Sequence, residues 1–203
     1  MERDPSSMRP PETVRQLRTP AALELADLTA IFEDLTKVVG CCERILSTQE
    51  RDGAGEVLLE SLWVAALVSY RRCFSANEHG VALSEQDLHE TGLQGDVVQW
   101  HEMLERVRAH YVDSSVNARD HFVVGAAQDS DGNADGIAIT STPRPRPDET
   151  TVRQTGRIAL ELSRIVDQRI ETRQEAVRDA ARSMSPRTLS SLPVVRVAVP
   201  EEA

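Results

Sequence analysis

Apolar residues recur every three or four positions in the first long patterned stretch of the chain, between Leu25 and Leu46. This spacing gathers them on one face of an α-helix and leaves the polar residues on the other face. Thr19 can cap the helix, and Pro20 is well tolerated in a first helical turn. The pattern predicts an amphipathic helix over residues 20–47, with an apolar face of Leu25, Leu28, Ile31, Phe32, Leu35, Val38, Val39, Cys42, Ile45 and Leu46.

The second stretch, residues 56–74, is apolar around most of its circumference and leaves little room for a solvated face. We therefore expect this helix to be the central helix of a bundle. Ser84 followed by Asp87 resembles a capping box and predicts a short helix that ends near Gly92. A further helix should begin near Asp96 and carry one apolar face, made of Val97, Val98, Trp100, Met103, Leu104, Val107 and Tyr111.

The period of the pattern changes after this helix. Residues 121–127 and 136–142 are short segments rich in β-branched residues, and the turn-forming string DSDGNAD lies between them. These features predict a β-hairpin near residues 121–142.

The string PRPRP, residues 143–147, has to be extended because alternating prolines exclude a helix. Asp148 then restarts a helical pattern that continues to about Ser183. The second half of this helix, residues 171–182, is mostly charged, and we expect it to project from the body of the protein.

Together these elements predict a mainly α fold, a bundle of about four to five helices with one β-hairpin insertion, over residues 20–183. Residues 1–19 are polar, contain three prolines and show no periodicity, which predicts a disordered arm. Residues 184–203 should form a flexible tail that includes a strand-like run between two prolines.

The net charge of −10 opposes general attraction to a nucleic-acid backbone, so any RNA contact would have to be local. No apolar run approaches the roughly twenty residues that cross a bilayer, and charges and prolines stand where a signal peptide needs apolar residues. We expect a cytoplasmic protein with no membrane contact.

Cys41, Cys42 and Cys73 give no disulfide framework and are interpreted as reduced core thiols. Because Lys37 is the only lysine among the 23 basic residues, a GC-rich and bacterial genome is also expected.

Metal and cofactor sites have little support in the sequence. The hairpin turn resembles a calcium loop in its alternating oxygen-bearing residues, but Ala134 replaces the required glycine and Thr140 replaces the bidentate glutamate. Neither the five histidines nor the cysteines show a zinc spacing, and the chain has no phosphate-binding or nucleophile-elbow motif. We expect no metal and no cofactor.

The remaining candidates are two segments, LWVAALVSYRRCFS at residues 62–75 and HEMLERVRAHYVDSSVN at residues 101–117. Ordinary helix ends also contain arginines and short polar residues. Cations are stabilised by the negative end of the helix dipole at the C-terminus, and the side chains of Asp, Ser and Asn form hydrogen bonds with backbone groups in place of the helical ones. A structural role and a functional site therefore both remain open on composition alone.

The order of these elements resembles a group of bacterial HEPN-like proteins. In that group the first helix typically ends in a Tyr-x-Arg-Cys-Phe-like string, the second ends in an Arg-x-Lys-x-Val-Ala-His-Ser-x-Asn-like string, and the similarity covers residues 20–170. Active members are ribonucleases whose Arg-x4-6-His motif meets its copy across a homodimer and cleaves RNA without metal. The resemblance places the motif arginine on Arg108, the valine on Val112, the small residue on Asp113 and the serine on Ser115. The histidine position falls on Ser114.

This departure from the family motif bears directly on function. Histidine can accept and donate a proton near neutral pH, whereas a serine hydroxyl without an activating base cannot. His110 does not restore the motif because only three residues separate it from Arg106, and His121 lies on the first hairpin strand. We therefore expect no ribonuclease activity.

The leading hypothesis is a HEPN-like, homodimeric binding or structural module without catalysis, in a bacterial toxin-antitoxin or defence setting. The residues that would line its polar pocket for a nucleotide or a peptide end are Arg72, Arg108, Asp113, Ser114 and Asn117. A second hypothesis is a metal-independent endoribonuclease whose catalytic candidates are Arg108, His110 and Ser114, with His110 or His121 in the displaced role. A third is an adaptor or regulator that binds a protein partner through its last helix and tail.

Overall fold

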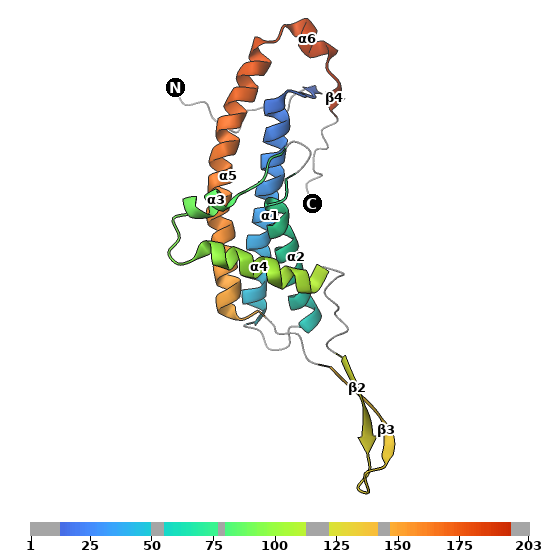
Figure 1. The fold of residues 1–203 in the computed structure, drawn as a ribbon. Coiled ribbons are helices and arrows are strands. Elements are labelled where there is room, and N and C mark those ends of the chain that lie inside the picture. The colour runs from blue at the N-terminus through green and yellow to red at the C-terminus, as the bar shows by residue number, and fades with distance from the viewer. Residues whose placement is uncertain (1–12, 50–54, 77–79, 113–121, 142–146, 196–203) are drawn as a thin grey trace.

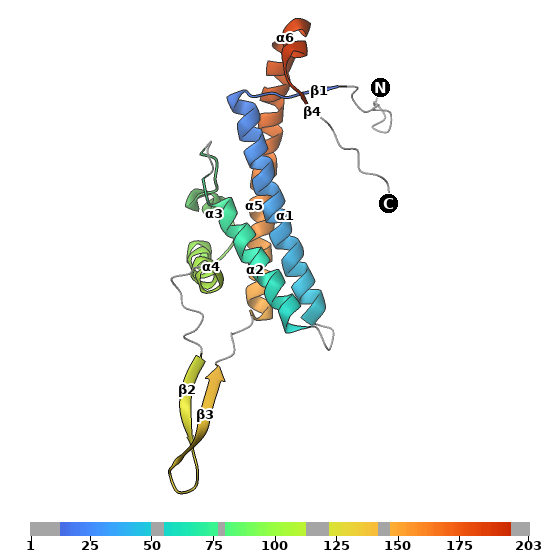
Figure 2. The ribbon, with the colours of Figure 1, turned by 90° about the vertical axis from the view of Figure 1, so that its right-hand side faces the viewer.

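The computed structural model describes residues 13–49, 55–76, 80–112, 122–141 and 147–195, and these residues are mainly helical. Three helices form the body: α1 (Pro20–Gln49), α2 (Glu56–Cys73) and α5 (Glu149–Ser183). The short helix α3 (Glu85–Glu90) and the crossing helix α4 (Val97–Val112) lie on one side of this body (Figures 1 and 2). The helices expected from the sequence are confirmed, with ends displaced by at most a few residues.

Helix α1 is the central helix of the body, because it packs extensively against both α2 and α5. The expectation that the helix over residues 56–74 would be central was wrong. The first turn of α2 leaves Val57 77% exposed and Leu58 47% exposed. The apolar residues around the circumference of α2 thus indicated that much of this helix is buried. They did not indicate that α1, rather than α2, lies between two long helices.

Helices α1 and α5 run antiparallel and approach closely along their length (Figure 1). A Cβ atom added at Gly156 of α5 would lie 3.1 Å from the Cβ atom of Cys42 on α1, so a side chain here would push the two helices apart by a few tenths of an ångström. Near the other end of the pair, Arg173 of α5 forms an ion pair with Glu24 of α1. Beyond Ile170, α5 has no buried residue.

The core between these helices consists of closely packed aliphatic and aromatic side chains. Its largest fully buried members are Trp63, Tyr70, Leu35, Ile45, Leu67, Leu88, Leu104, Leu162, Val38, Val152 and Val166. Cys42 and Cys73 are buried within it and Cys41 is half-buried, all three as free thiols. Burial raises the pKa of the Cys42 and Cys73 thiols to about 12, so both remain protonated and unreactive at neutral pH.

Local side chains explain where several helices begin. Asp148 accepts a hydrogen bond from the Thr151 amide at 2.7 Å and caps α5, and Asp96 accepts one from the Gln99 amide at 2.8 Å before α4. At the start of α3, the buried Asp87 carboxylate accepts hydrogen bonds from the amide of Ser84 at 2.7 Å and from its hydroxyl at 2.9 Å. The same carboxylate pairs with Arg169, which fastens α3 to α5.

The predicted hairpin is confirmed as the antiparallel strands β2 (Phe122–Gln128) and β3 (Ala134–Ser141). At its turn, Asp129 accepts hydrogen bonds from the amides of Asp131 and Asn133, and Gly132 adopts a positive φ of 84°. The aspartate oxygens therefore stabilise the turn itself, in agreement with the turn interpretation. The hairpin lies outside the helical body (Figures 1 and 2).

The expectation for the two tails needs correction where the structure describes them. Strand β1 (Val14–Arg15) pairs with β4 (Val194–Val195), and Arg15 also donates a hydrogen bond to the Leu192 carbonyl at 2.8 Å. Helix α6 (Pro186–Ser191), capped by the Ser185 hydroxyl, connects α5 to this pair. The arm and the tail are thus joined at one end of the α1–α5 pair. The PRPRP string lies largely outside the described residues.

Within the described ranges, no helix combines the length and apolarity that a membrane span requires.

Candidate functional site

The C-terminal turn of α2 carries the first half of the candidate site. Its two arginines lie where cations interact favourably with the helix dipole. Arg71 donates a hydrogen bond to the Phe74 carbonyl at 3.1 Å, which holds its guanidinium over the helix end. Arg72 pairs with the largely buried carboxylate of Asp34 on α1 at 3.2 Å, so its charge is already partnered within the fold.

Helix α4 supplies the second half from one face. His101, Glu105 and Arg108 are spaced by four and three residues, which brings their side chains onto neighbouring turns of the same face. This face meets the end of α2. The Tyr70 hydroxyl lies 3.1 Å from His101 Nδ1, and the rings of Phe74 and His101 have centroids 4.4 Å apart.

The aromatic surroundings of His101 determine its charge. Burial is the main cause that lowers the pKa of His101 below its ordinary value of 6.5; the Glu105 carboxylate opposes this shift, and the Arg71 guanidinium adds to it. His101 is therefore neutral at pH 7. Burial also raises the pKa of Tyr70, so the hydroxyl is protonated. The pair forms a neutral contact that fixes α4 against α2.

Beside this contact, two arginines share one carboxylate. Oε2 of Glu105 lies 3.1 Å from Arg71 Nε and 3.7 Å from Arg108 Nε. The Arg108 side chain is 26% exposed, but its Nε atom is buried and has no hydrogen-bond acceptor among the residues that the structure describes. Among the described residues, Glu105 is the one carboxylate within 4 Å of these two guanidiniums, and Glu85 and Glu102 act on the neighbouring His101. This arrangement can attract an anion, since arginine binds carboxylate and phosphate groups well.

Of the residues predicted for the polar pocket, Arg72 and Arg108 are described and Asp113, Ser114 and Asn117 are not. The described residues give the two arginines no common partner, because Arg72 pairs with Asp34 on α1 and Arg108 approaches Glu105 on its own helix. Whether they line one pocket with the residues after Val112 therefore stays a prediction.

The alternative catalytic histidines occupy different situations. His110 is exposed in the last turn of α4, two residues from Arg108, and residues two apart leave a helix on different faces. His121 lies outside the described residues. The structure therefore does not bring His110 together with the Arg71–Glu105–Arg108 cluster.

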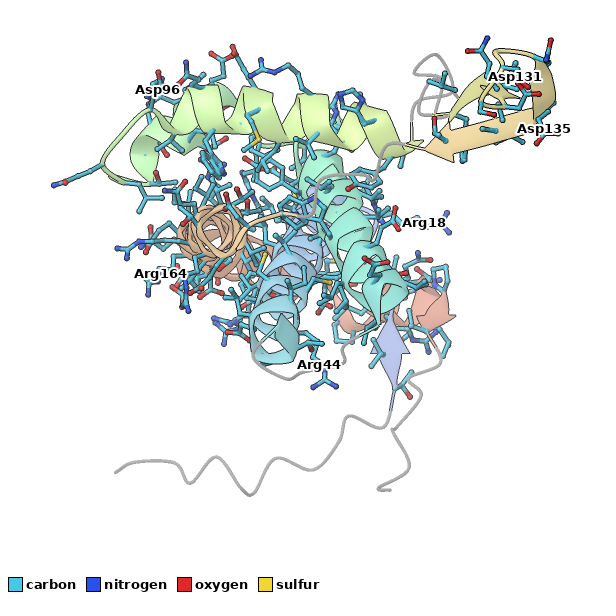
Figure 3. The ribbon with its side chains drawn as sticks, turned by 90° about the horizontal axis from the view of Figure 1, so that it is seen from below. Arg18, Arg44, Asp96, Asp131, Asp135 and Arg164 are labelled. Carbon is cyan, nitrogen blue, oxygen red and sulfur yellow. The ribbon has the colours of Figure 1, made fainter. Side chains whose placement is uncertain are left out.

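Sequence reasoning missed three members of the junction: Tyr70, His101 and Glu105. The spacing of His101, Glu105 and Arg108 was present in the sequence and indicated a shared face of the helix. The contact of His101 with Tyr70 depends on the angle at which α4 crosses α2, which no local pattern encodes. Figure 3 shows α4 lying along one side of the body, crosswise to the other helices.

A separate surface cavity of about 740 Å³ lies at the opposite end of α4. It is open to solvent, and its mixed lining includes Asp96, Trp100, Gln154 and Arg157. The Trp100 indole donates to Thr155 at 3.4 Å, so its polar atom is already used inside the fold. Among the described residues, no group of three His, Cys, Asp or Glu side chains could hold a metal ion.

The chain was compared with models of known protein families, with curated proteins and with solved structures, and none of them matches it.

Proposed function

We propose that this chain is a HEPN-like helical protein that binds an anionic group at the junction of α2 and α4 and does not cleave RNA. The observation that carries the proposal is the shared carboxylate of Glu105. It lies within 4 Å of two guanidiniums, those of Arg71 and Arg108, and no other described carboxylate lies within 4 Å of either. The proposed ligand is a phosphate or carboxylate group, as on a nucleotide or at a peptide end.

The ligand would complete the hydrogen bonding of Arg108. Buried donors are nearly always satisfied in folded proteins, and a charged donor that lacks an acceptor is costly. The Arg108 Nε atom meets this description in the described part of the chain. An anion that accepts hydrogen bonds from the exposed side of the Arg108 guanidinium and from Arg71 would act as a second counter-charge, and would release Glu105 from Arg71 so that it could accept a hydrogen bond from Nε.

Proton transfer is the step that this site does not support. The family resemblance places Ser114 at the position of the catalytic histidine. His101 contacts Tyr70, is neutral, and lies seven residues before Arg108, which corresponds to roughly 10 Å along the helix axis. A general base has to lie within hydrogen-bonding reach of the group it deprotonates. Binding without chemistry is therefore the function that these residues favour.

The proposal is tested by titrating a fluorescently labelled mononucleotide into wild-type protein and two variants. Arg108→Ala should weaken binding about 10- to 100-fold, which corresponds to the roughly 1.5–3 kcal/mol of a charge-assisted hydrogen bond. Arg106→Ala is the matched control, because Arg106 is 66% exposed and pairs with Glu102 on another face of α4. Equal affinities for wild type and Arg108→Ala would reject the site.

Two other functions would be favoured by different outcomes. Cleavage of RNA by the wild type that Arg108→Ala or His110→Ala abolishes would favour the ribonuclease, which would then use a displaced histidine. Loss of a co-purifying protein after truncation at Ser183 would favour the adaptor, whose exposed surface is the part of α5 beyond Ile170. A bacterial toxin-antitoxin or defence setting belongs to the same proposal.

A further inference from the structure

The β2–β3 hairpin carries an apolar face that no described residue covers. Val124 pairs with Ile139 and Ala126 pairs with Ile137 across the two strands, so these four side chains and that of Phe122 share one side of the hairpin. We name these five residues the apolar hairpin face. The exposed fraction of its larger members ranges from 58% for Phe122 to 72% for Ile137. Figures 1 and 2 show the hairpin extending away from the helices.

A hairpin in this position lacks the packing that usually stabilises one. Two strands alone are at best marginally stable in water, and a sheet with an apolar face normally packs against a second layer. The opposite side offers little packing of its own, because Gly125, Ala127, Gly136 and Ala138 dominate it. An external surface that covers the apolar hairpin face would supply the missing layer.

We propose that the apolar hairpin face packs against the same face of a second copy of this chain. The face contains no charged residue, so two copies can meet without burying an unpaired charge. Its side chains expose on the order of 500 Å² per copy, and two copies together approach the roughly 1,000 Å² that a specific interface needs. A single patch that is complementary to itself gives a closed two-fold dimer.

The charges at the hairpin tip determine how the two copies are oriented. Asp129, Asp131 and Asp135 lie in and beside the turn, and Figure 3 shows Asp131 and Asp135 at this end of the hairpin. A parallel arrangement would bring six carboxylates together, whereas an antiparallel arrangement keeps the two tips at opposite ends. The same carboxylates oppose insertion of the tip into a lipid bilayer. This inference uses no residue of the α2–α4 junction and does not depend on the proposed function.

The interface is tested by multi-angle light scattering and sedimentation equilibrium on the full chain. Wild type should have twice the 22.5 kDa mass of one chain at micromolar concentration. Ile139→Asp should weaken dimerisation at least tenfold, with an unchanged circular dichroism melting curve for the helices because Ile139 is not part of their core. Val57→Asp is the control: Val57 is as exposed, lies on α2 and should leave the dimer intact. A monomeric wild type, or an Ile139→Asp variant that dimerises as tightly as wild type, would overturn the proposal.

The orientation is tested separately by cross-linking variants that each carry one added cysteine with a bismaleimide whose reach is about the 10 Å between two packed sheets. Ala126→Cys lies near the middle of the face, where the two-fold axis of an antiparallel pair places equivalent residues opposite each other, so it should be cross-linked between the chains. Asp131→Cys should not, because the two tips would be separated by roughly 25 Å, the length of the strands. Wild type measures any background from Cys41, which is half-buried. Efficient cross-linking of Asp131→Cys without cross-linking of Ala126→Cys would contradict the antiparallel dimer.

Discussion

The pairing of Asp87 with Arg169 predicts an asymmetric response to mutation of its two partners. The Asp87 side chain is only 4% exposed, whereas that of Arg169 is 39% exposed. Removing the arginine leaves a buried carboxylate without its counter-charge, while removing the carboxylate leaves a guanidinium that water can reach. Arg169→Met should therefore cost more free energy of unfolding than Asp87→Asn.

The magnitude follows from what remains around each partner. Loss of one member of a fully buried ion pair costs about 3–5 kcal/mol. In Arg169→Met, Asp87 keeps its two hydrogen bonds from Ser84, so we expect a cost of about 2–3 kcal/mol. Asp87→Asn removes the charge but retains an acceptor, and should cost about 1–2 kcal/mol.

The assay is urea unfolding followed by circular dichroism, for wild type, both single variants and the double variant at one protein concentration. The two mutations should be non-additive, with a coupling free energy of about 1–2 kcal/mol, because each removes the same interaction. Glu90→Gln is the control, because Glu90 contacts the same arginine at 3.4 Å but is exposed, and should change stability by less than about 0.5 kcal/mol. Additive effects of Asp87→Asn and Arg169→Met would refute the reasoning.

Two further predictions concern His101 and the contact of α1 with α5. Because the folded-state pKa of His101 is lowered below 6.5, the unfolded state binds its proton more readily. The stability that neutral His101 contributes is therefore present above pH 6.5 and is lost as the pH falls below 6.5. In the His101→Gln variant, the urea midpoint should decrease less between pH 7 and pH 5 than it does in wild type. An equal decrease in both proteins would contradict this. Gly156→Ala should destabilise the protein by about 1 kcal/mol because its Cβ atom meets Cys42, whereas Gly40→Ala, with open space, should stabilise it by roughly 0.5–1 kcal/mol. Thermal melting of both variants tests this pair, and stabilisation by Gly156→Ala would show that the helices separate easily.

The helices could be predicted from sequence because their signals are local. The three- and four-residue spacing from Leu25 onward, the Ser84–Asp87 pair and the Asp148 cap each depend on residues within one or two turns. The position of each helix in the bundle could not be predicted in the same way. The apolar circumference of α2 did not reveal that α1 would be the helix with two large neighbours.

The parts that the sequence did not reveal depend on contacts between distant residues. Strands β1 and β4 are two residues each and lie about 180 positions apart, so neither has a periodicity of its own. At the candidate site, Arg72 and Arg108 could be named from the sequence, but the contact of Tyr70 with His101 spans 31 positions and depends on how α4 crosses α2. The shared carboxylate of Glu105 depends on the same crossing.

The central claim is that the α2–α4 junction binds an anion without cleaving RNA, and one experiment measures both properties in the same sample. A single-stranded RNA oligonucleotide labelled at both ends is incubated with wild-type protein in EDTA, with anisotropy reporting binding and loss of energy transfer reporting cleavage. The account predicts saturable binding that Arg108→Ala weakens at least tenfold, with no cleavage by either protein. Metal-independent cleavage by the wild type that is lost in Arg108→Ala would contradict it.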